Sequence, residues 1–291
     1  MHTLLDEKTA FSHIPPKADD LHKGSAGKLY LVAGSRSFRG AAVLATMGAL
    51  RSGCGYVTLA STAEVCGNIS HHLLTPTLRV LPENSEGRIA RPAAQTILRE
   101  AAGYHALVLG CGLGLDADTE ALVREVLLHF EGPVVLDADG INALARGIDM
   151  VREAPAKVVL TPHEGEMARL CQTSVQTVHR DRAGAACTLA KEYGVWVALK
   201  GPHTLIASPN GQLLENTSGN SGLAKGGSGD ILSGMIGSLL AQGLDPLWAA
   251  GCGVYLHGAA ADLSARRMSR YCMQPPDLLD DLPEIFIRNG R

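Results

Sequence analysis

The segment 224–234, AKGGSGDILSG, combines the features of an anion-binding site with a potential base. Closely spaced glycines around Ser228 expose backbone N–H groups, and Asp230 follows at the expected start of an apolar helix. Helix N-termini favour anions because their first N–H groups are unpaired and the helix dipole is positive there. A carboxylate beside a bound phosphate could therefore accept a proton from a substrate hydroxyl. The simpler alternative is a glycine-rich turn in which Asp230 only caps the helix.

Two acidic segments follow expected strands. In 136–142, LDADGIN, Asp137 and Asp139 could bind magnesium or hydroxyl groups, although capping of the next helix is the favoured interpretation from the residues alone. In 161–166, TPHEGE, a carboxylate could hold Mg²⁺, which usually takes one or two carboxylates plus substrate phosphates. The competing interpretation is a helix cap by Thr161 with Glu164 at capping-box spacing.

A cationic segment, 200–204 or KGPHT, follows another expected strand. Lys200 could meet a phosphate there, and Thr204 could bond a ribose or phosphate oxygen. A lone lysine at a strand end is otherwise solvated. The glycines of 110–114, GCGLG, suggest a dinucleotide-binding turn, but Leu115 stands where the G-x-G-x-x-G pattern requires glycine. Ligand contact and a plain turn therefore both stay open for this segment.

Alternating strands and helices are expected to position these segments. The apolar patterns predict strands at 28–33, 56–60, 105–109, 134–136, 157–160 and 195–199, with helices at 41–50, 63–74, 117–130, 141–145, 164–171 and 178–193. A hairpin with strands 204–207 and 212–215 follows, and then helices 230–241 and 246–263. Repeated strand–helix units predict a mostly parallel α/β sheet with helices on both faces. Ligands bind at the carboxyl ends of such strands, where the polar segments lie.

Composition excludes several other classes of protein. The 291 residues carry 26 Lys+Arg against 29 Asp+Glu, and 46% are hydrophobic, so a substantial core is expected and nucleic acid is not an expected partner. The uncharged run 231–244 is shorter than the roughly 20 residues of a membrane span. The start MHTLLDEKTA lacks the basic and then apolar order of a secretory signal. We expect a cytoplasmic protein without a membrane partner, whose seven cysteines, free of C-x-x-C pairs, are core thiols.

Taken together and in order, these motifs resemble one family. KGSAGKLYLVAGS, GCGLG, LDADGIN, TPHEGE, KGPHT and NTSGNSGLAKGGSGDILSG are similar to the motifs of the ADP/ATP-dependent NAD(P)H-hydrate dehydratases, a branch of the ribokinase-like superfamily. The resemblance covers about 23–263 and implies one ribokinase-like domain over 1–291, without the fused N-terminal epimerase domain of some members. Cys111 stands where the family usually has proline, and Ser228 where threonine is common.

The resemblance also implies the activity. Members phosphorylate the hydroxyl of an (S)-NAD(P)H hydrate at the expense of ADP or ATP, and elimination of phosphate restores NADH or NADPH. Asp230 would be the catalytic base and would also contact the hydrate, and Glu166 would bind Mg²⁺. The other implied residues are Lys200, Gly201, Pro202, His203, Thr204, Gly227, Ser228 and Gly229 for the nucleotide, and Ala42, Gly112, Gly114 and His163 for the hydrate.

Three further expectations come from this resemblance. ADP is the expected phosphoryl donor, with AMP as the product, because the chain resembles bacterial members more than eukaryotic ones. A homo-oligomer, specifically a tetramer, is expected. The alternative function is a small-molecule kinase of the same fold that acts on a vitamin precursor and releases a stable phosphate ester.

Overall fold

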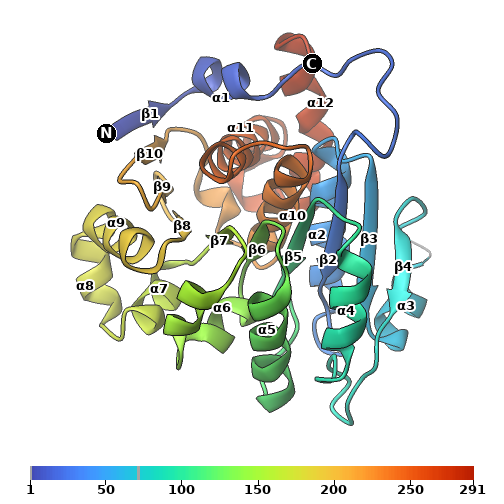
Figure 1. The fold of residues 1–291 in the computed structure, drawn as a ribbon. Coiled ribbons are helices and arrows are strands. Elements are labelled where there is room, and N and C mark those ends of the chain that lie inside the picture. The colour runs from blue at the N-terminus through green and yellow to red at the C-terminus, as the bar shows by residue number, and fades with distance from the viewer. Residues whose placement is uncertain (1, 71–72) are drawn as a thin grey trace.

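The structure is a computed structural model that describes residues 2–70 and 73–291. Within these residues one sheet of ten strands has the order β1-β10-β9-β8-β7-β6-β5-β2-β3-β4 (Figure 1). The strands are β1 (His2–Leu5), β2 (Lys28–Val32), β3 (Tyr56–Ser61), β4 (Thr77–Val80), β5 (Ala106–Leu109), β6 (Val134–Leu136), β7 (Val158–Leu160), β8 (Trp196–Leu199), β9 (Leu205–Ala207) and β10 (Leu213–Asn216).

Strand direction divides the sheet into a parallel part and a short antiparallel edge. All neighbouring strands from β8 to β4 run parallel, as the repeated strand–helix units predict. The hairpin strand β9 is antiparallel to both β8 and β10, and β1 adds to β10 in parallel. The loops that follow β5, β6, β7 and β8 therefore leave the same edge of the sheet.

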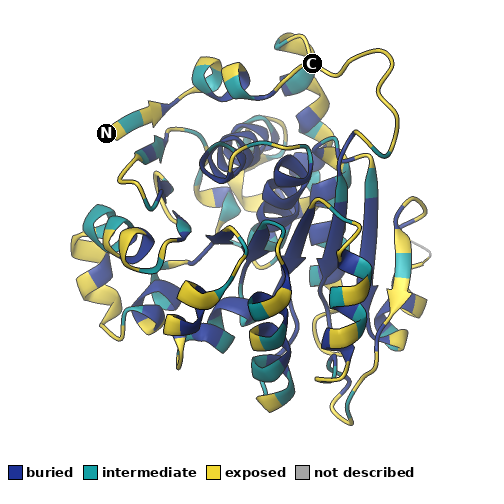
Figure 2. Ribbon diagram, in the orientation of Figure 1, coloured by how far each residue is buried: buried dark blue, intermediate teal, exposed yellow. Residues whose placement is uncertain are grey.

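Helices cover both faces. They are α1 (Glu7–His13), α2 (Arg39–Arg51), α3 (Ala63–Ile69), α4 (Ala93–Ala101), α5 (Ala117–His129), α6 (Asp139–Leu144), α7 (Glu164–Leu170), α8 (Val175–Arg180), α9 (Arg182–Tyr193), α10 (Ser228–Ala241), α11 (Pro246–Cys272) and α12 (Leu278–Arg288). Alternate residues of β2 enter different cores: Leu29 and Leu31 pack with α2, α10 and α11, whereas Tyr30 and Val32 pack with the layer of α4, α5 and α6. A parallel sheet buried on both faces explains the continuous apolar runs of its strands (Figure 2).

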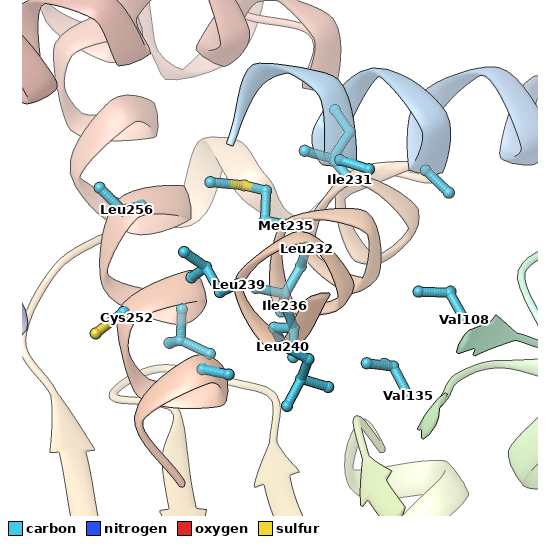
Figure 3. Close-up of a cluster of buried hydrophobic side chains, with 14 of the residues drawn as sticks. Val108, Val135, Ile231, Leu232, Met235, Ile236, Leu239, Leu240, Cys252 and Leu256 are labelled. Carbon is cyan, nitrogen blue, oxygen red and sulfur yellow. The ribbon is translucent and has the colours of Figure 1, made fainter. Parts of the chain in front are cut away.

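Helix α10 is the most buried helix of the core that α2, α10 and α11 form with one face of the sheet. Its apolar side chains surround it on all sides, with Val108 and Val135 of the sheet on one flank and Cys252 and Leu256 of α11 on another (Figure 3). Glycines let α2 approach it closely, because a Cβ at Gly234 would lie 1.9 Å from the Ala45 carbonyl oxygen. This packing fixes the position of the α10 N-terminus, which carries Asp230.

The N-terminal segment with β1 and α1 and the C-terminal helix α12 lie on the same side of the molecule (Figure 1). Arg288 donates from Nε to Glu7 at 2.7 Å, and Arg291 donates to the Ile14 carbonyl at 2.8 Å. Strand β1 in turn pairs with β10, where Leu5 lies opposite Asn216. The C-terminal helix thus holds the N-terminal segment against the antiparallel edge of the sheet.

Most predicted elements are confirmed, with several corrections. The helix expected over 178–193 is two helices, because Asp181 has a non-helical backbone (φ −142°, ψ 72°) and its side chain caps α9. The helix expected over 63–74 ends as α3 at Ile69, and residues 71–72 lie outside the described residues. The helix expected to end at 263 continues to a break at Ser269, whose φ of 71° is not helical, and α11 includes a short turn beyond it to Cys272. Elements β1, β4, α1, α4 and α12 were not predicted.

Four cysteines are core thiols as expected: Cys54, Cys66, Cys111 and Cys252. That expectation is wrong for Cys272, which is exposed, and only partly right for Cys171 and Cys187, which are half-buried. Among the described residues, no helix has the length and apolar character needed to cross a membrane.

Candidate active site

The polar loops predicted to meet do so at the carboxyl edge of the parallel strands. Asp137 follows β6, the segment 161–163 follows β7, and Lys200 follows β8. The N-terminus of α10 reaches the same edge, since a Cβ added to Gly229 would lie 3.3 Å from Lys200 Nζ and 3.7 Å from Asp137 Oδ2. The glycine-rich turn 226–229, Lys200 and the segment after β6 therefore lie at one site.

Asp137 is the most completely bonded side chain of this site. Its Oδ1 accepts from Lys200 Nζ and from Thr161 Oγ1, each at 2.8 Å, and its Oδ2 accepts from Ser233 Oγ at 2.8 Å. The carboxylate is 2% exposed. Burial alone would raise the pKa of Asp137, but the charge and hydrogen bond of Lys200 and the two hydroxyl donors outweigh it and lower that pKa. Asp137 is therefore ionised.

The interpretation of Asp137 as a helix cap is wrong. The residue before α6 is Ala138, whose φ of 47° is left-handed, and no side chain caps this helix. Asp139 begins the helix and accepts a hydrogen bond from the Gly114 N–H at 2.8 Å. Asp137 faces the interior because its carboxylate pairs with Lys200 instead.

Asp230 lies in the first turn of α10, and its carboxylate makes no capping hydrogen bond. The helix begins after Gly227, whose φ is 98°, and no side chain makes a capping hydrogen bond there. The capping-only interpretation of Asp230 is therefore wrong. Burial raises the pKa of Asp230 to about 7, the negative charge of Asp137 adds to this rise, and Lys200 opposes it. A carboxylate that titrates near neutrality is suited to general-base catalysis.

The Cys111 thiol lies between the two acids. Its Sγ and one carboxylate oxygen each of Asp137 and Asp230 lie within 4.8 Å of one another. Burial, together with both negative charges, holds the pKa of the thiol well above its ordinary range, so Cys111 stays protonated. This trio does not suit Mg²⁺, which prefers oxygen ligands alone, and Asp137 already neutralises Lys200.

Glu166 completes a capping box with His163, and the expected cap by Thr161 and Glu164 is wrong. His163 is the N-cap of α7 and accepts from the Gly165 and Glu166 N–H groups, while Glu166 Oε2 accepts from the His163 N–H at 2.8 Å. Lys200 Nζ lies 3.8 Å from the same oxygen. The other oxygen, Oε1, is 3.6 Å from His163 Nε2, beyond hydrogen-bonding distance, so one carboxylate oxygen is available to a hard cation.

The segment Lys200–Thr204 lines a cavity of about 540 Å³. The remaining lining residues come from the loop after β10 and from α10 and α11: Asn216, Thr217, Ser218, Gly219, Asn220, Ser221, Leu223, Ala224, Leu232, Val254, His257 and Gly258. Lys200 is not the solvated lysine that its strand-end position suggested, because its side chain is 20% exposed and bonded to Asp137. Burial lowers the pKa of Lys200, but Asp137 and Glu166 outweigh burial and raise it.

The residues expected to contact the hydrate lie in different surroundings. Ala42 is fully buried, so its side chain is not open to a ligand in this conformation. Gly112 is left-handed (φ 63°), and a Cβ there would lie 2.6 Å from that of Ala41. His163 is exposed at the mouth of the site, next to Glu166. Ala42, Gly112 and Gly114 do not line the cavity described above, and their contact with the hydrate stays a prediction.

Several site residues were not identified from the sequence. Ser233 and Thr161, which bond Asp137, resemble ordinary helix and strand-end hydroxyls, and only the fold shows that both point to one carboxylate. The cavity wall 216–224 lies within the quoted motif NTSGNSGLA, whose glycine and asparagine content was the available signal. His257 lies in an alanine- and glycine-rich helix and carried no spacing signal.

Comparisons with known proteins identify the family. A sequence model of the family described as NAD(P)H-hydrate dehydratase matches residues 29–284. An ADP-dependent (S)-NAD(P)H-hydrate dehydratase of Neisseria meningitidis is 39% identical over 89% of this chain and 85% of its own. A bifunctional NAD(P)H-hydrate repair enzyme of Moorella thermoacetica is 41% identical over 97% of this chain. The chain spans about half the length of such bifunctional relatives, 53% in this case.

Solved structures give the same result. The ADP/ATP-dependent NAD(P)H-hydrate dehydratase of Bacillus subtilis, co-crystallised with ATP and Mg²⁺, has a TM-score of 0.84 at 32% identity and covers 99% of this chain and 98% of that one. A ribokinase-like superfamily protein from Enterococcus faecalis has a TM-score of 0.85 at 23% identity over 99% of this chain and 96% of that one, which shows the fold. The chain therefore belongs to the NAD(P)H-hydrate dehydratase family, within the ribokinase-like fold.

Proposed function

We propose that this protein is an ADP-dependent (S)-NAD(P)H-hydrate dehydratase. The observation that carries the proposal is Asp230, a group with a pKa of about 7 in the Gly227–Gly229 turn region, close to Lys200. Lys200 in turn lines a cavity of about 540 Å³, which residues 227–230 themselves do not line. Family membership supplies the substrate class. The overall reaction converts hydrate and ADP into NADH or NADPH, AMP and inorganic phosphate.

The first step is phosphoryl transfer to a hydroxyl. Ionised Asp230 accepts the proton of the hydrate hydroxyl as its oxygen bonds to the terminal phosphorus, and the bond from that phosphorus to the nucleotide breaks to release AMP. The N–H groups of Gly227 and Gly229 at the α10 N-terminus stabilise the charge on the transferring group. The Ser228 N–H donates to the Lys225 carbonyl at 3.3 Å, so Ser228 would contribute through its hydroxyl, which has no hydrogen-bond partner. Asp137 keeps Lys200 at this edge through their 2.8 Å hydrogen bond.

The second step needs less from the protein. Hydroxide is a poor leaving group, but the phosphate ester lets the lone pair of the ring nitrogen expel inorganic phosphate. Loss of a proton from the neighbouring ring carbon then restores the dihydronicotinamide. Because phosphate leaves within the same anion-binding turn, the N–H groups that stabilised transfer also accommodate the product.

The nucleotide is assigned to the cavity beside Lys200–Thr204. Glu166 would hold Mg²⁺ through its free carboxylate oxygen together with nucleotide phosphates, and the metal would supply charge neutralisation. The hydrate would approach from the side of His163, whose backbone pairs with that of Lys200. We expect both substrates to meet at Asp230, as an in-line transfer requires.

One assay tests the proposal. Hydrate, Mg²⁺ and either ADP or ATP are incubated with the protein, and the reduced nicotinamide absorbance, AMP and inorganic phosphate are measured. Equal formation of NAD(P)H and phosphate supports the proposal, with faster turnover expected for ADP. Accumulation of a stable phosphate ester from a vitamin precursor, without conversion of the hydrate, would instead support the kinase alternative.

A homo-tetramer and a cytoplasmic location belong to the same proposal. The tetramer is inferred from the family and is measured by multi-angle light scattering of the purified protein. A monomer at assay concentration would remove the tetramer from the proposal without affecting the chemistry at Asp230.

A further inference from the structure

His257 is a buried histidine on the wall of the proposed nucleotide cavity, and its Nε2 atom has no hydrogen-bond partner in the described structure. It lies on α11 and is 7% exposed. Among the described residues, three buried side-chain polar atoms make no hydrogen bond: Arg182 Nε, Ser228 Oγ and His257 Nε2. Arg182 Nε still lies 3.2 Å from Glu164 Oε1 in an ion pair. Of these residues, only His257 lines the cavity of about 540 Å³. A buried polar atom left unpaired costs free energy, so a fold that keeps one at a cavity wall is consistent with a ligand partner.

The position of the ring within the cavity indicates which part of a nucleotide it meets. The positive charge of Lys200 acts on the ring, and so does the backbone of Ser228. Lys200 and Ser228 belong to the phosphate end of the proposed site. His257 therefore faces the end where negative charge would enter, and not the end that would hold the base.

Burial and the charge of Lys200 keep the His257 ring neutral. Burial lowers the pKa of His257 to about 4; the Ser228 backbone opposes this, and Lys200 adds to it. Charged side chains on the elements around α11 are engaged elsewhere: Glu7 with Arg288, Asp281 with Arg267, Glu215 with His2, and Asp262 with Asn220. Asp230 on α10 faces Cys111 and Asp137. The cavity thus lacks a counter-charge for His257 that phosphates would supply.

We propose that His257 is a nucleotide-binding residue, whose Nε2 donates a hydrogen bond to a phosphate oxygen and whose ring takes up a proton from solvent as the phosphates bind. The inference rests on the proposed function only in taking the cavity ligand to be an adenine nucleotide. With the Ser228 backbone on one side and a phosphate on the other, both ring nitrogens become donors, which the imidazolium form satisfies. His257 would then be a second cation at the phosphates beside Lys200.

Calorimetric titration of the purified protein with ADP and with adenosine tests the contact. His257→Leu should weaken ADP binding about tenfold to a hundredfold, the usual contribution of a hydrogen bond to a charged group. Adenosine binding should not change, because adenosine lacks phosphates. Without ligand, His257→Leu should melt at or above the parent temperature, since leucine removes an unpartnered buried polar atom. Weaker adenosine binding, or unchanged ADP binding, would overturn the proposal.

Nuclear magnetic resonance of isotope-labelled histidine tests the proton uptake. The His257 signals are assigned by their loss in His257→Asn, and titration with ADP at about pH 6 should convert them to imidazolium shifts, while adenosine leaves them neutral. His129→Leu, an exposed histidine that is 57% accessible, is the matched control and should bind ADP normally. A ring that stays neutral with ADP bound refutes the proposal. If ADP binds as expected but no hydrate is converted, the proposed function fails while His257 retains its role.

Discussion

Replacing Lys200 by methionine tests the buried ion pair at the centre of the site. The substitution leaves Asp137, 2% exposed, without its cation. Breaking a buried pair by removing one partner costs about 3–5 kcal/mol. The lower end is expected, about 3 kcal/mol, because Thr161 and Ser233 still donate to the carboxylate. At about 2 °C per kcal/mol for a chain of this size, Lys200→Met should lower Tm by roughly 6 °C.

The destabilisation of Lys200→Met should depend on pH. The pKa of folded Asp137 is lowered, so its ionised form contributes stability above the unfolded pKa, and this contribution is lost as the pH falls through the folded pKa. The difference in Tm between the parent and Lys200→Met should therefore be full at neutral pH and shrink in acid. Thermal unfolding across this range measures it.

A double variant supplies the control. Asp137→Asn combined with Lys200→Met removes both charges, so most of the lost stability should return, whereas nucleotide binding stays weak if Lys200 contacts phosphate. A Lys200→Met protein as stable as the parent at neutral pH would refute the ion-pair reasoning. It would also favour the simpler interpretation from sequence, a solvated lysine at a strand end.

Three other predictions follow from the same geometry. Asp230→Asn should lower hydrate turnover about 10²–10⁴-fold with ADP binding retained, and near-normal turnover would exclude Asp230 as the base. The substitution removes no capping hydrogen bond, and it removes an acid whose folded pKa is raised. The Tm of the variant at about pH 8 should therefore not fall below that of the parent. In the parent, kcat/KM should rise with pH to a plateau above about 7 as Asp230 ionises. Asp137→Asn should move this rise to lower pH, because it removes a negative charge next to Asp230. An unshifted pH profile would contradict the electrostatic coupling between Asp137 and Asp230. Gly234→Ala should cost about 3 kcal/mol or more in denaturant unfolding, since its Cβ would lie 1.9 Å from the Ala45 carbonyl oxygen, and a stable variant would mean that α2 and α10 can separate freely.

The sequence predicted the parallel α/β core well because buried strands of such sheets are short apolar runs that end at glycine or polar loops. Elements at the periphery were missed for physical reasons. Strand β4 is largely exposed and lacks an apolar run, and β1 is recognisable only through its pairing with β10. Local pattern does not contain that pairing.

The site shows the same division. GGSGD and Asp230 were identified because a turn, a helix start and an acid are adjacent in sequence. The role of Asp137 was misjudged as capping because its partners, Thr161, Lys200 and Ser233, are distant in sequence and become neighbours only when β6, β7, β8 and α10 end at one edge. Partners that arise from tertiary structure are not visible in residue spacing.

The pairing of the chain ends has a consequence for how ligand binding could be detected. Leu5 lies opposite Asn216 and accepts a hydrogen bond from Thr217 Oγ1 at 3.0 Å, and Asn216 and Thr217 both line the cavity. Strand β1 is therefore hydrogen-bonded to the cavity wall. Amide hydrogen exchange in residues 2–5 should slow when nucleotide fills the cavity. Exchange in an N-terminal peptide would then report whether the cavity is occupied, although residues 2–5 do not line it.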